Sequence, residues 1–82
     1  GNGYSDILVE IEEESIGIVI EVKYPDGGDL EKGCQEALDQ IDKMGYEEKL
    51  KQDGMETILK YGIACNRKRC KAAVDQGKRG GK

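Results

Sequence analysis

The 82-residue chain contains no histidine, no tryptophan and no phenylalanine, and it has a single proline. The lack of histidine excludes Ser-His-Asp and Cys-His nucleophilic catalysis, histidine-ligated zinc and imidazole acid–base chemistry. No apolar run approaches the ~18 residues that a membrane-spanning helix requires, so we expect no membrane partner. Any chemistry must therefore use carboxylates, lysine, tyrosine, cysteine or a metal held by carboxylates.

Hydrophobic residues are also scarce, at 37% of the chain, and four tyrosines are the only aromatic residues. A chain of this size buries only about 60–65% of its unfolded surface. We therefore expect one domain over residues 1–76, with a small core of isoleucine, leucine and valine. Residues 77–82 are basic and rich in glycine, which predicts a disordered tail.

Charge is divided unevenly along the chain. Residues 1–65 carry 6 basic and 16 acidic side chains, a net charge of −10, whereas residues 66–82 carry 7 basic and 1 acidic, a net charge of +6. The acidic body argues against a module that wraps DNA through charge alone. Clustered carboxylates are, however, what a hard divalent cation requires.

The three cysteines, Cys34, Cys65 and Cys70, form no Cys-x-x-Cys pair. Their odd number and the absence of a signal-like segment favour a reducing, cytoplasmic location. We expect all three to be small, buried apolar residues.

Hydrophobic periodicity predicts strands over residues 5–12, 16–23 and 56–65 and an amphipathic helix over residues 30–44. A short helical segment is expected over residues 46–52. The short loop between the first two strands predicts an antiparallel pair, and the helical crossover predicts a parallel pair. The fold class is therefore α/β with a mixed sheet.

The ends of these elements carry the expected signals. Asp29 is a candidate N-cap of the helix, and Gly45 is a candidate C-cap. Residues 67–74 alternate as a fourth strand would, although their propensities also permit a short helix; we favour the strand.

A tight turn at Glu13 and Glu14 sets the register of the first hairpin and places Asp6 directly opposite Glu21. One face of the hairpin then carries only branched aliphatic side chains, and we expect it to face the core. These residues are Ile7, Val9, Ile11, Ile16, Ile18, Ile20 and Val22.

The other face of the hairpin carries Asp6, Glu21 and Lys23. Two carboxylates facing each other across a strand pair have Cβ atoms ~5 Å apart and repel each other. Mg²⁺ or Mn²⁺ would offset this repulsion better than Lys23, and the ammonium could then stabilise charge on a phosphate under attack. The alternative is a solvated strand face with an ion pair worth ~0–1 kcal/mol.

Asp6, fourteen intervening residues and Glu21-Val22-Lys23 resemble the signature of the PD-(D/E)xK nuclease superfamily, with Ser5 in place of the usual proline. Downstream, the stretch Ala37-Leu-Asp-Gln-Ile followed by Gly45-Tyr46 is similar to the subgroup formerly called DUF1703. In anaerobic bacteria that subgroup usually lies C-terminal to an AAA-ATPase-like domain. Residues 61–70 also resemble it, so that the likeness covers about residues 3–74.

The resemblance implies a restriction-endonuclease-like core of order β-β-α-β-β, without the usual N-terminal helix and first strand. The chain would then be a fragment of a longer protein, with an exposed apolar patch that a homodimer could cover. The implied activity is metal-dependent hydrolysis of phosphodiester bonds in DNA or RNA, carried out in the full-length protein. An ATPase-like domain preceding the chain is the other implied partner.

The family pattern assigns roles to individual residues. Asp6 and Glu21 would bind Mg²⁺ or Mn²⁺, and Lys23 would be the catalytic lysine. Gln40 would act near the site from the helix, and Tyr46 would contact substrate.

Three basic residues, Arg67, Lys68 and Arg69, are candidates for contacts with the phosphate backbone. Their alternative role is a solvated basic turn, and a third interpretation of the chain is a nucleic-acid binder that uses this turn. A non-catalytic interaction or regulatory module that keeps the nuclease fold is the main alternative to the enzyme.

Overall fold

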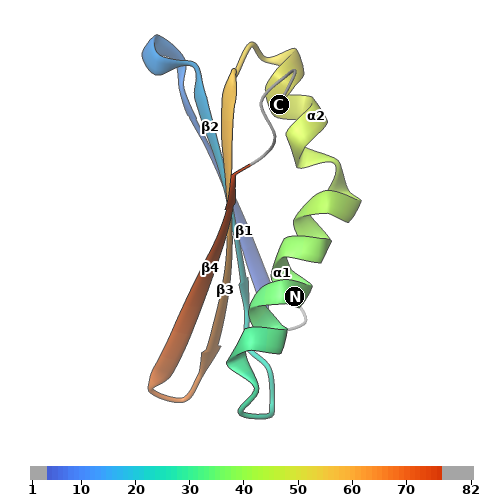
Figure 1. Ribbon diagram of the computed structural model, residues 1–82, viewed down its shortest axis with the longest axis vertical. Coiled ribbons are helices and arrows are strands. Elements are labelled where there is room, and N and C mark those ends of the chain that lie inside the picture. The colour runs from blue at the N-terminus through green and yellow to red at the C-terminus, as the bar shows by residue number, and fades with distance from the viewer. Residues whose placement is uncertain (1–3, 77–82) are drawn as a thin grey trace.

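The computed structural model describes residues 4–76, so the expected tail at residues 77–82 lies outside the described part. Four strands and two α-helices form two layers, with both helices on one face of a twisted sheet (Figure 1). The elements are β1 (Tyr4–Ile11), a 3₁₀ turn η1 (Glu12–Glu14), β2 (Ile16–Lys23), α1 (Leu30–Met44), α2 (Tyr46–Gln52), β3 (Thr57–Asn66) and β4 (Arg69–Gln76).

The sheet has the order β1-β2-β3-β4. Strands β1 and β2 are antiparallel, β2 and β3 are parallel, and β3 and β4 are antiparallel. The predicted mixed sheet is therefore confirmed, and residues 69–76 form a strand rather than a helix. The hairpin register is also confirmed, because Asp6 pairs with Glu21 and Leu8 pairs with Val19.

The helices cover the face that was not expected to be the core. Val19 and Glu21 of β2 are fully buried beneath them, together with Ile41 of α1 and Leu50 of α2. The aliphatic face of the hairpin lies on the opposite side, where Ile7 keeps 50% of its surface exposed. The prediction that this aliphatic face is the core face was therefore wrong.

Residue size gives a physical reason for this choice of face. A Cβ added to Gly62 of β3 would overlap the backbone carbonyl of Cys34 in α1. A Cβ on Gly17 would come within 3.0 Å of the Leu50 side chain. Helices can therefore approach the sheet closely on this side, whereas branched side chains at every position would hold them further away.

We call the other side the open face. It consists of the odd-numbered residues of β1 and β3 and the even-numbered residues of β2 and β4. Within residues 4–76 no helix packs on it (Figure 1).

Helix α1 begins and ends where the sequence predicted. The Asp29 side chain accepts a hydrogen bond from the backbone N–H of Lys32 at 3.0 Å. At the other end Gly45 has φ of 74°, the left-handed conformation that glycine adopts without strain. Because α2 starts directly after Gly45, the chain changes direction there and continues along the sheet.

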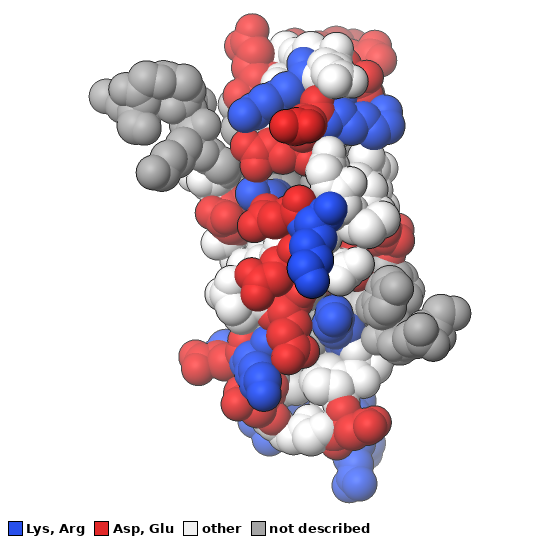
Figure 2. Space-filling view, turned by 90° about the vertical axis from the view of Figure 1, so that its right-hand side faces the viewer, with Lys and Arg blue, Asp and Glu red and all other residues white. Residues whose placement is uncertain are grey.

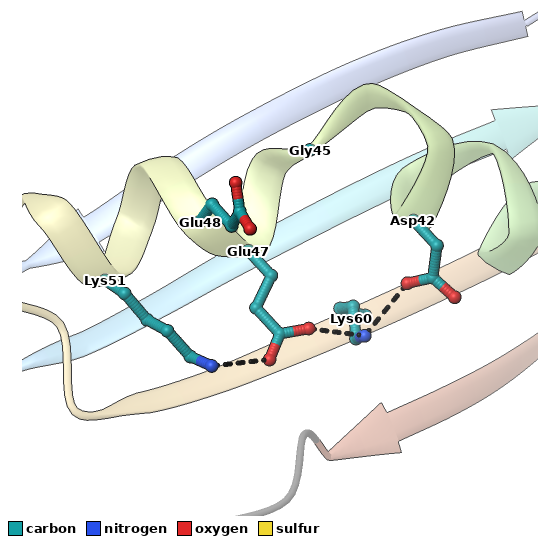
Figure 3. Close-up of a pocket in the computed structure, with 6 residues that line it drawn as sticks. All are labelled: Asp42, Gly45, Glu47, Glu48, Lys51 and Lys60. Atoms are coloured by element: carbon teal, nitrogen blue, oxygen red, sulfur yellow. Dashed lines mark hydrogen bonds and ion pairs between the residues drawn. The ribbon is translucent and has the colours of Figure 1, made fainter.

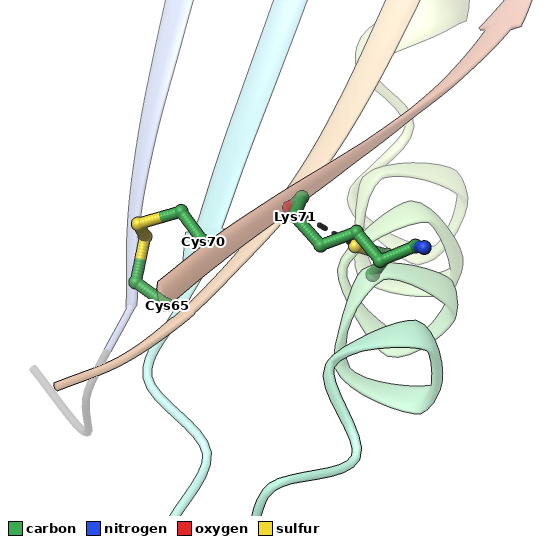
Figure 4. The surroundings of a disulfide bond; sticks show 4 residues. Cys65, Cys70 and Lys71 are labelled. Atoms are coloured by element: carbon green, nitrogen blue, oxygen red, sulfur yellow. Dashed lines mark hydrogen bonds between the residues drawn. A yellow bond between two sulfur atoms is a disulfide. The ribbon is translucent and has the colours of Figure 1, made fainter. Parts of the chain in front are cut away.

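The cysteines differ in part from expectation. Cys34 is free and buried, and its thiol donates a hydrogen bond to the Lys71 carbonyl at 3.1 Å. Cys65 and Cys70 pair across β3 and β4 and form a disulfide on the side of the sheet away from α1 (Figure 4). The expectation of three buried, reduced cysteines is therefore wrong for this pair, whereas the cytoplasmic location stays a prediction.

Neither helix in residues 4–76 is both long and apolar enough to span a bilayer.

Candidate functional site

Asp6, Glu21 and Lys23 lie on the helix-covered face at neighbouring positions of β1 and β2. Asp6 is directly opposite Glu21, and Lys23 is two residues further along the same face of β2. At ~3.3 Å of rise per strand residue, the Lys23 and Glu21 Cα atoms are separated by ~6.6 Å along the strand. The three predicted site residues are thus brought together by one hairpin register.

The environment of Glu21 is unusual for a carboxylate. The residue is 0% exposed, and both of its side-chain oxygens are buried without a hydrogen-bond partner. Burial raises the pKa of Glu21, repulsion from Asp6 raises it further, and attraction to Lys23 partly lowers it. A buried acceptor without a partner is destabilising, which is the condition that a bound cation or donor would relieve.

Tyr46 reaches the site from the first turn of α2. Its hydroxyl donates a hydrogen bond to Asp6 Oδ2, a contact between residues 40 positions apart. The turn at Gly45 makes this contact, because it directs the start of α2 back toward β1. The contact of Tyr46 with substrate stays a prediction, and the structure places the Tyr46 hydroxyl against Asp6, a candidate metal ligand.

A second cluster of charges lies next to this contact and was not predicted. The buried ammonium of Lys60 in β3 binds Asp42 Oδ1 and Glu47 Oε1, each at 3.0 Å (Figure 3). Asp75 Oδ2 of β4 lies 3.7 Å from the same ammonium. Burial alone would lower the pKa of Lys60, but hydrogen bonds to Glu47 and Asp42 outweigh it and raise that pKa. The hydrogen bond from Lys60 in turn lowers the pKa of Glu47.

These ion pairs connect the end of α1 with the start of α2 on either side of Tyr46. Asp42 belongs to the last turn of α1, and Glu47 belongs to the first turn of α2. Lys60 therefore holds the turn at Gly45 against the sheet. A lone lysine within the apolar stretch of residues 57–65 was the sequence signal that could have identified it.

The other predicted residues belong to α1 and to the β3–β4 turn. Gln40 is half-buried on α1, next to the fully buried Ile41. Arg67, Lys68 and Arg69 are exposed at the β3–β4 turn. Lys23 at the end of β2 pairs with Ala64 near the end of β3. The β3–β4 turn therefore lies just beyond Lys23 at the same end of the sheet.

The end of the sheet that carries the basic turn is tied to the β2–α1 loop. The Asn66 amide donates to the carbonyls of Pro25, Asp26 and Gly27 at 2.6, 3.2 and 3.0 Å. Figure 1 shows the β2–α1 loop and the β3–β4 turn at the same end of the molecule. The basic side chains and the ammonium of Lys23 are thus arranged around one end of the sheet.

The two carboxylates suit a hard cation whose remaining ligands are water molecules and substrate oxygens. Across residues 4–76 no group of three or more acidic or cysteine side chains could hold a metal ion. The candidate protein ligands are therefore two in number, Asp6 and Glu21. Mg²⁺ is commonly held by one or two carboxylates, with water and substrate phosphates completing its shell. The unpartnered oxygens of Glu21 opposite Asp6 fit that requirement.

Comparison with known proteins agrees with this geometry. A family model described as the PD-(D/E)XK nuclease superfamily matches residues 1–74. Searches of curated proteins and of solved structures found no match.

Proposed function

From the premise that the chain belongs to the PD-(D/E)XK nuclease superfamily, we propose that it hydrolyses phosphodiester bonds of nucleic acid with the help of Mg²⁺ or Mn²⁺. Asp6 and Glu21 hold the cation in this proposal. The observation that carries it is Glu21, a fully buried carboxylate with two unpartnered oxygens directly across from a second carboxylate. Burying a carboxylate without a hydrogen-bond partner is costly, and a bound cation would compensate for that cost.

The bound cation would supply Lewis acidity toward a phosphoryl oxygen and toward water. The other roles belong to side chains of this chain. Lys23 places positive charge beside the two carboxylates, where negative charge grows on the phosphate during attack. Tyr46 orients Asp6 through its hydroxyl hydrogen bond, and Gln40 is proposed to position substrate or water from α1.

The basic β3–β4 turn is the proposed contact for the nucleic-acid backbone. Its exposed residues 67–69 lie at the end of the sheet toward which Lys23 is placed. Phosphate contacts of this kind fix the position of a substrate but carry no sequence information. The proposed substrate is therefore defined by its phosphodiester chemistry, as DNA or RNA.

The wider context is proposed from the family likeness. The nuclease-like domain spans residues 1–76, belongs to the DUF1703 subgroup and works beside an ATPase-like domain in a longer bacterial protein of the cytoplasm. A homodimer of the chain belongs to the same proposal.

A second candidate is a non-catalytic module that keeps the nuclease fold. It is favoured by the small donor set, because no group of three or more acidic or cysteine side chains in residues 4–76 could hold a metal ion, and Asp6 already accepts a hydrogen bond from Tyr46. Such a module would retain the hairpin and its packing without binding a cation.

Titration with Mn²⁺ followed by NMR separates the two candidates. The nuclease proposal expects paramagnetic broadening centred on Asp6 and Glu21, and the broadening should disappear in Glu21→Gln. A cleavage assay with the full-length protein then compares Lys23→Ala with Lys32→Ala, an exposed lysine of α1. Loss of metal-dependent cleavage in the first variant alone supports catalysis, whereas the absence of both metal binding and cleavage supports the module.

A further inference from the structure

Lys60 is set apart from the other lysines of residues 4–76 by its burial. Acidic and basic side chains are closely spaced over the helical side of the molecule (Figure 2). Lys49, Lys51 and Lys71 also form ion pairs, but their side chains are 60%, 59% and 50% exposed, whereas that of Lys60 is 6% exposed. Exposed pairs of this kind hold elements together weakly, whereas a buried charge requires its partners.

The partners of Lys60 come from three elements other than its own strand. Asp42 in α1 and Glu47 in α2 each lie 3.0 Å from the ammonium, and Asp75 in β4 lies 3.7 Å from it. Figure 3 shows the ammonium between Asp42 and Glu47. Gly45 alone separates the two helices. Lys60 therefore constrains the direction in which α2 leaves α1.

The first turn of α2 is anchored on both sides of β2. The Tyr46 hydroxyl donates a hydrogen bond to Asp6 of β1, and Glu47 accepts one from Lys60 of β3. Strand β2 lies between β1 and β3, which are thus ~9.6 Å apart at ~4.8 Å per strand. A helix has a diameter of about 10–12 Å with its side chains, so its first turn can reach both strands.

The loss of one anchor would allow α2 to turn about its axis. Apolar packing of the buried Leu50 keeps α2 on the sheet, but such packing has no preferred direction. Side-chain tips lie ~5–6 Å from a helix axis, so a rotation of ~20° moves them by ~2 Å. A hydrogen bond between oxygens spans only about 2.5–3.0 Å. A rotation of that size would therefore separate the Tyr46 hydroxyl from Asp6.

We propose that Lys60 is a positioning residue, which holds the first turn of α2 so that the Tyr46 hydroxyl stays on Asp6. The inference rests on the proposed function in one respect, since it takes Asp6 to be a ligand of the divalent cation. Lys60 then raises the affinity for the cation without contacting it.

Charge alone would have the opposite effect on cation binding. Lys60 lies on the same face of the sheet as the carboxylate pair, and an ammonium there repels a cation. Removing it would raise the affinity if electrostatics decided the outcome. Removing it lowers the affinity if positioning decides the outcome, so the sign of the change distinguishes the two.

Calorimetric titration of the 82-residue chain with Mn²⁺ measures this change. Lys60→Met should weaken binding by ~10-fold, as expected for Tyr46→Phe, because both remove support from the same metal ligand. A chain with both substitutions should also lose ~10-fold, whereas independent contributions would multiply to ~100-fold. Circular dichroism identifies the conditions under which every variant is folded.

Lys51→Met is the matched control. Lys51 pairs with Glu47 at 3.2 Å, as Lys60 does at 3.0 Å, and its removal deletes the same charge. Lys51 belongs to the same helix as Glu47, however, so this pair cannot hold α2 against the sheet. The substitution should change the Mn²⁺ affinity by no more than ~2-fold.

A second pair of variants applies if Lys60→Met does not fold. Glu47→Gln removes the carboxylate that Lys60 holds in α2. Glu48→Gln removes the same charge from the next residue, which is exposed. Glu47→Gln should weaken Mn²⁺ binding more than Glu48→Gln does, and equal effects of the two would contradict the proposal.

Carbon-13 NMR of the Asp6 carboxyl group provides a readout without metal. Tyr46→Phe should shift this signal, Lys60→Met should shift it in the same direction, and Lys51→Met should leave it in place. If the parent chain binds no Mn²⁺, the proposed function fails, and the Asp6 signal alone decides whether Lys60 positions Tyr46.

Three results would overturn the proposal. One is an Mn²⁺ affinity that is unchanged or higher in Lys60→Met. Another is a ~100-fold loss of affinity when Lys60→Met and Tyr46→Phe are combined, which shows that the two residues act independently. The third is an Asp6 signal that stays at its parent position in Lys60→Met.

Discussion

Replacing Glu21 with glutamine is expected to stabilise the protein in the absence of divalent metal. Glu21 is 0% exposed and neither carboxylate oxygen has a hydrogen-bond partner. An unsatisfied buried polar group costs ~1–3 kcal/mol, and more when it is charged. Glutamine keeps the length of the side chain and removes the charge, although its amide stays without partners. We therefore expect a gain of ~1 kcal/mol, which in a domain of this size raises Tm by ~4–8 °C.

The gain should depend on pH in a defined direction. Burial and the neighbouring Asp6 raise the pKa of Glu21 above 4.5 in the folded protein. Below the unfolded pKa the group is protonated in both states, so the parent carries no charge penalty there. As the pH rises from the unfolded pKa through the folded pKa, the parent loses stability that the glutamine variant keeps. The difference between the two proteins should therefore be small in acid and largest at neutral pH.

Urea unfolding at a series of pH values measures this difference. Glu36→Gln is the matched control, because Glu36 is exposed on α1 and its replacement should change stability by no more than ~0.5 kcal/mol. Mn²⁺ should stabilise the parent and leave Glu21→Gln unchanged. A variant no more stable than the parent at pH 7, or one whose advantage is the same at every pH, would refute the reasoning.

Three further changes test the surroundings of the site. Lys60→Met should destabilise the fold by ~1–3 kcal/mol in urea unfolding, since it removes the charged hydrogen bonds from β3 to Asp42 of α1 and Glu47 of α2. The same change at the exposed Lys51 should cost under ~0.5 kcal/mol. Tyr46→Phe should weaken Mn²⁺ binding by ~10-fold in calorimetry through loss of the hydrogen bond to Asp6, and unchanged affinity would count against an orienting role. Neutralising the basic turn at residues 67–69 should reduce the salt dependence of nucleic-acid binding by ~1 unit of slope per contacting residue, and an unchanged slope would place the backbone contact elsewhere.

Local sequence signals were sufficient for the arrangement of the elements. The turn at Glu13 and Glu14 determined the pairing of Asp6 with Glu21, because hairpin register follows from the position of the turn. The glycine at position 45 determined the end of α1 through its left-handed conformation. These features depend on a few neighbouring residues, so they could be predicted without knowledge of the tertiary structure.

Contacts between distant segments were not predictable in the same way. The hydrogen bond from Tyr46 to Asp6 spans 40 residues, and the ion pair between Lys60 and Asp42 spans 18. Each depends on how closely α1 and α2 approach the sheet. Periodicity identifies the face on which a side chain lies, but it contains no information on which helix meets that face.

The incorrect choice of core face has a physical explanation that also bears on the site. The all-aliphatic face was expected inside because apolar area favours burial, but this rule does not say which layer removes that area from water. The chain's own helices pack instead on the face with Gly17 and Gly62, where a close approach is available. That packing is also what buries Glu21 and deprives its oxygens of water. Covering this face with helices thus produces the buried, unpartnered carboxylate of Glu21 opposite Asp6, and within residues 4–76 it leaves the aliphatic face without a helix.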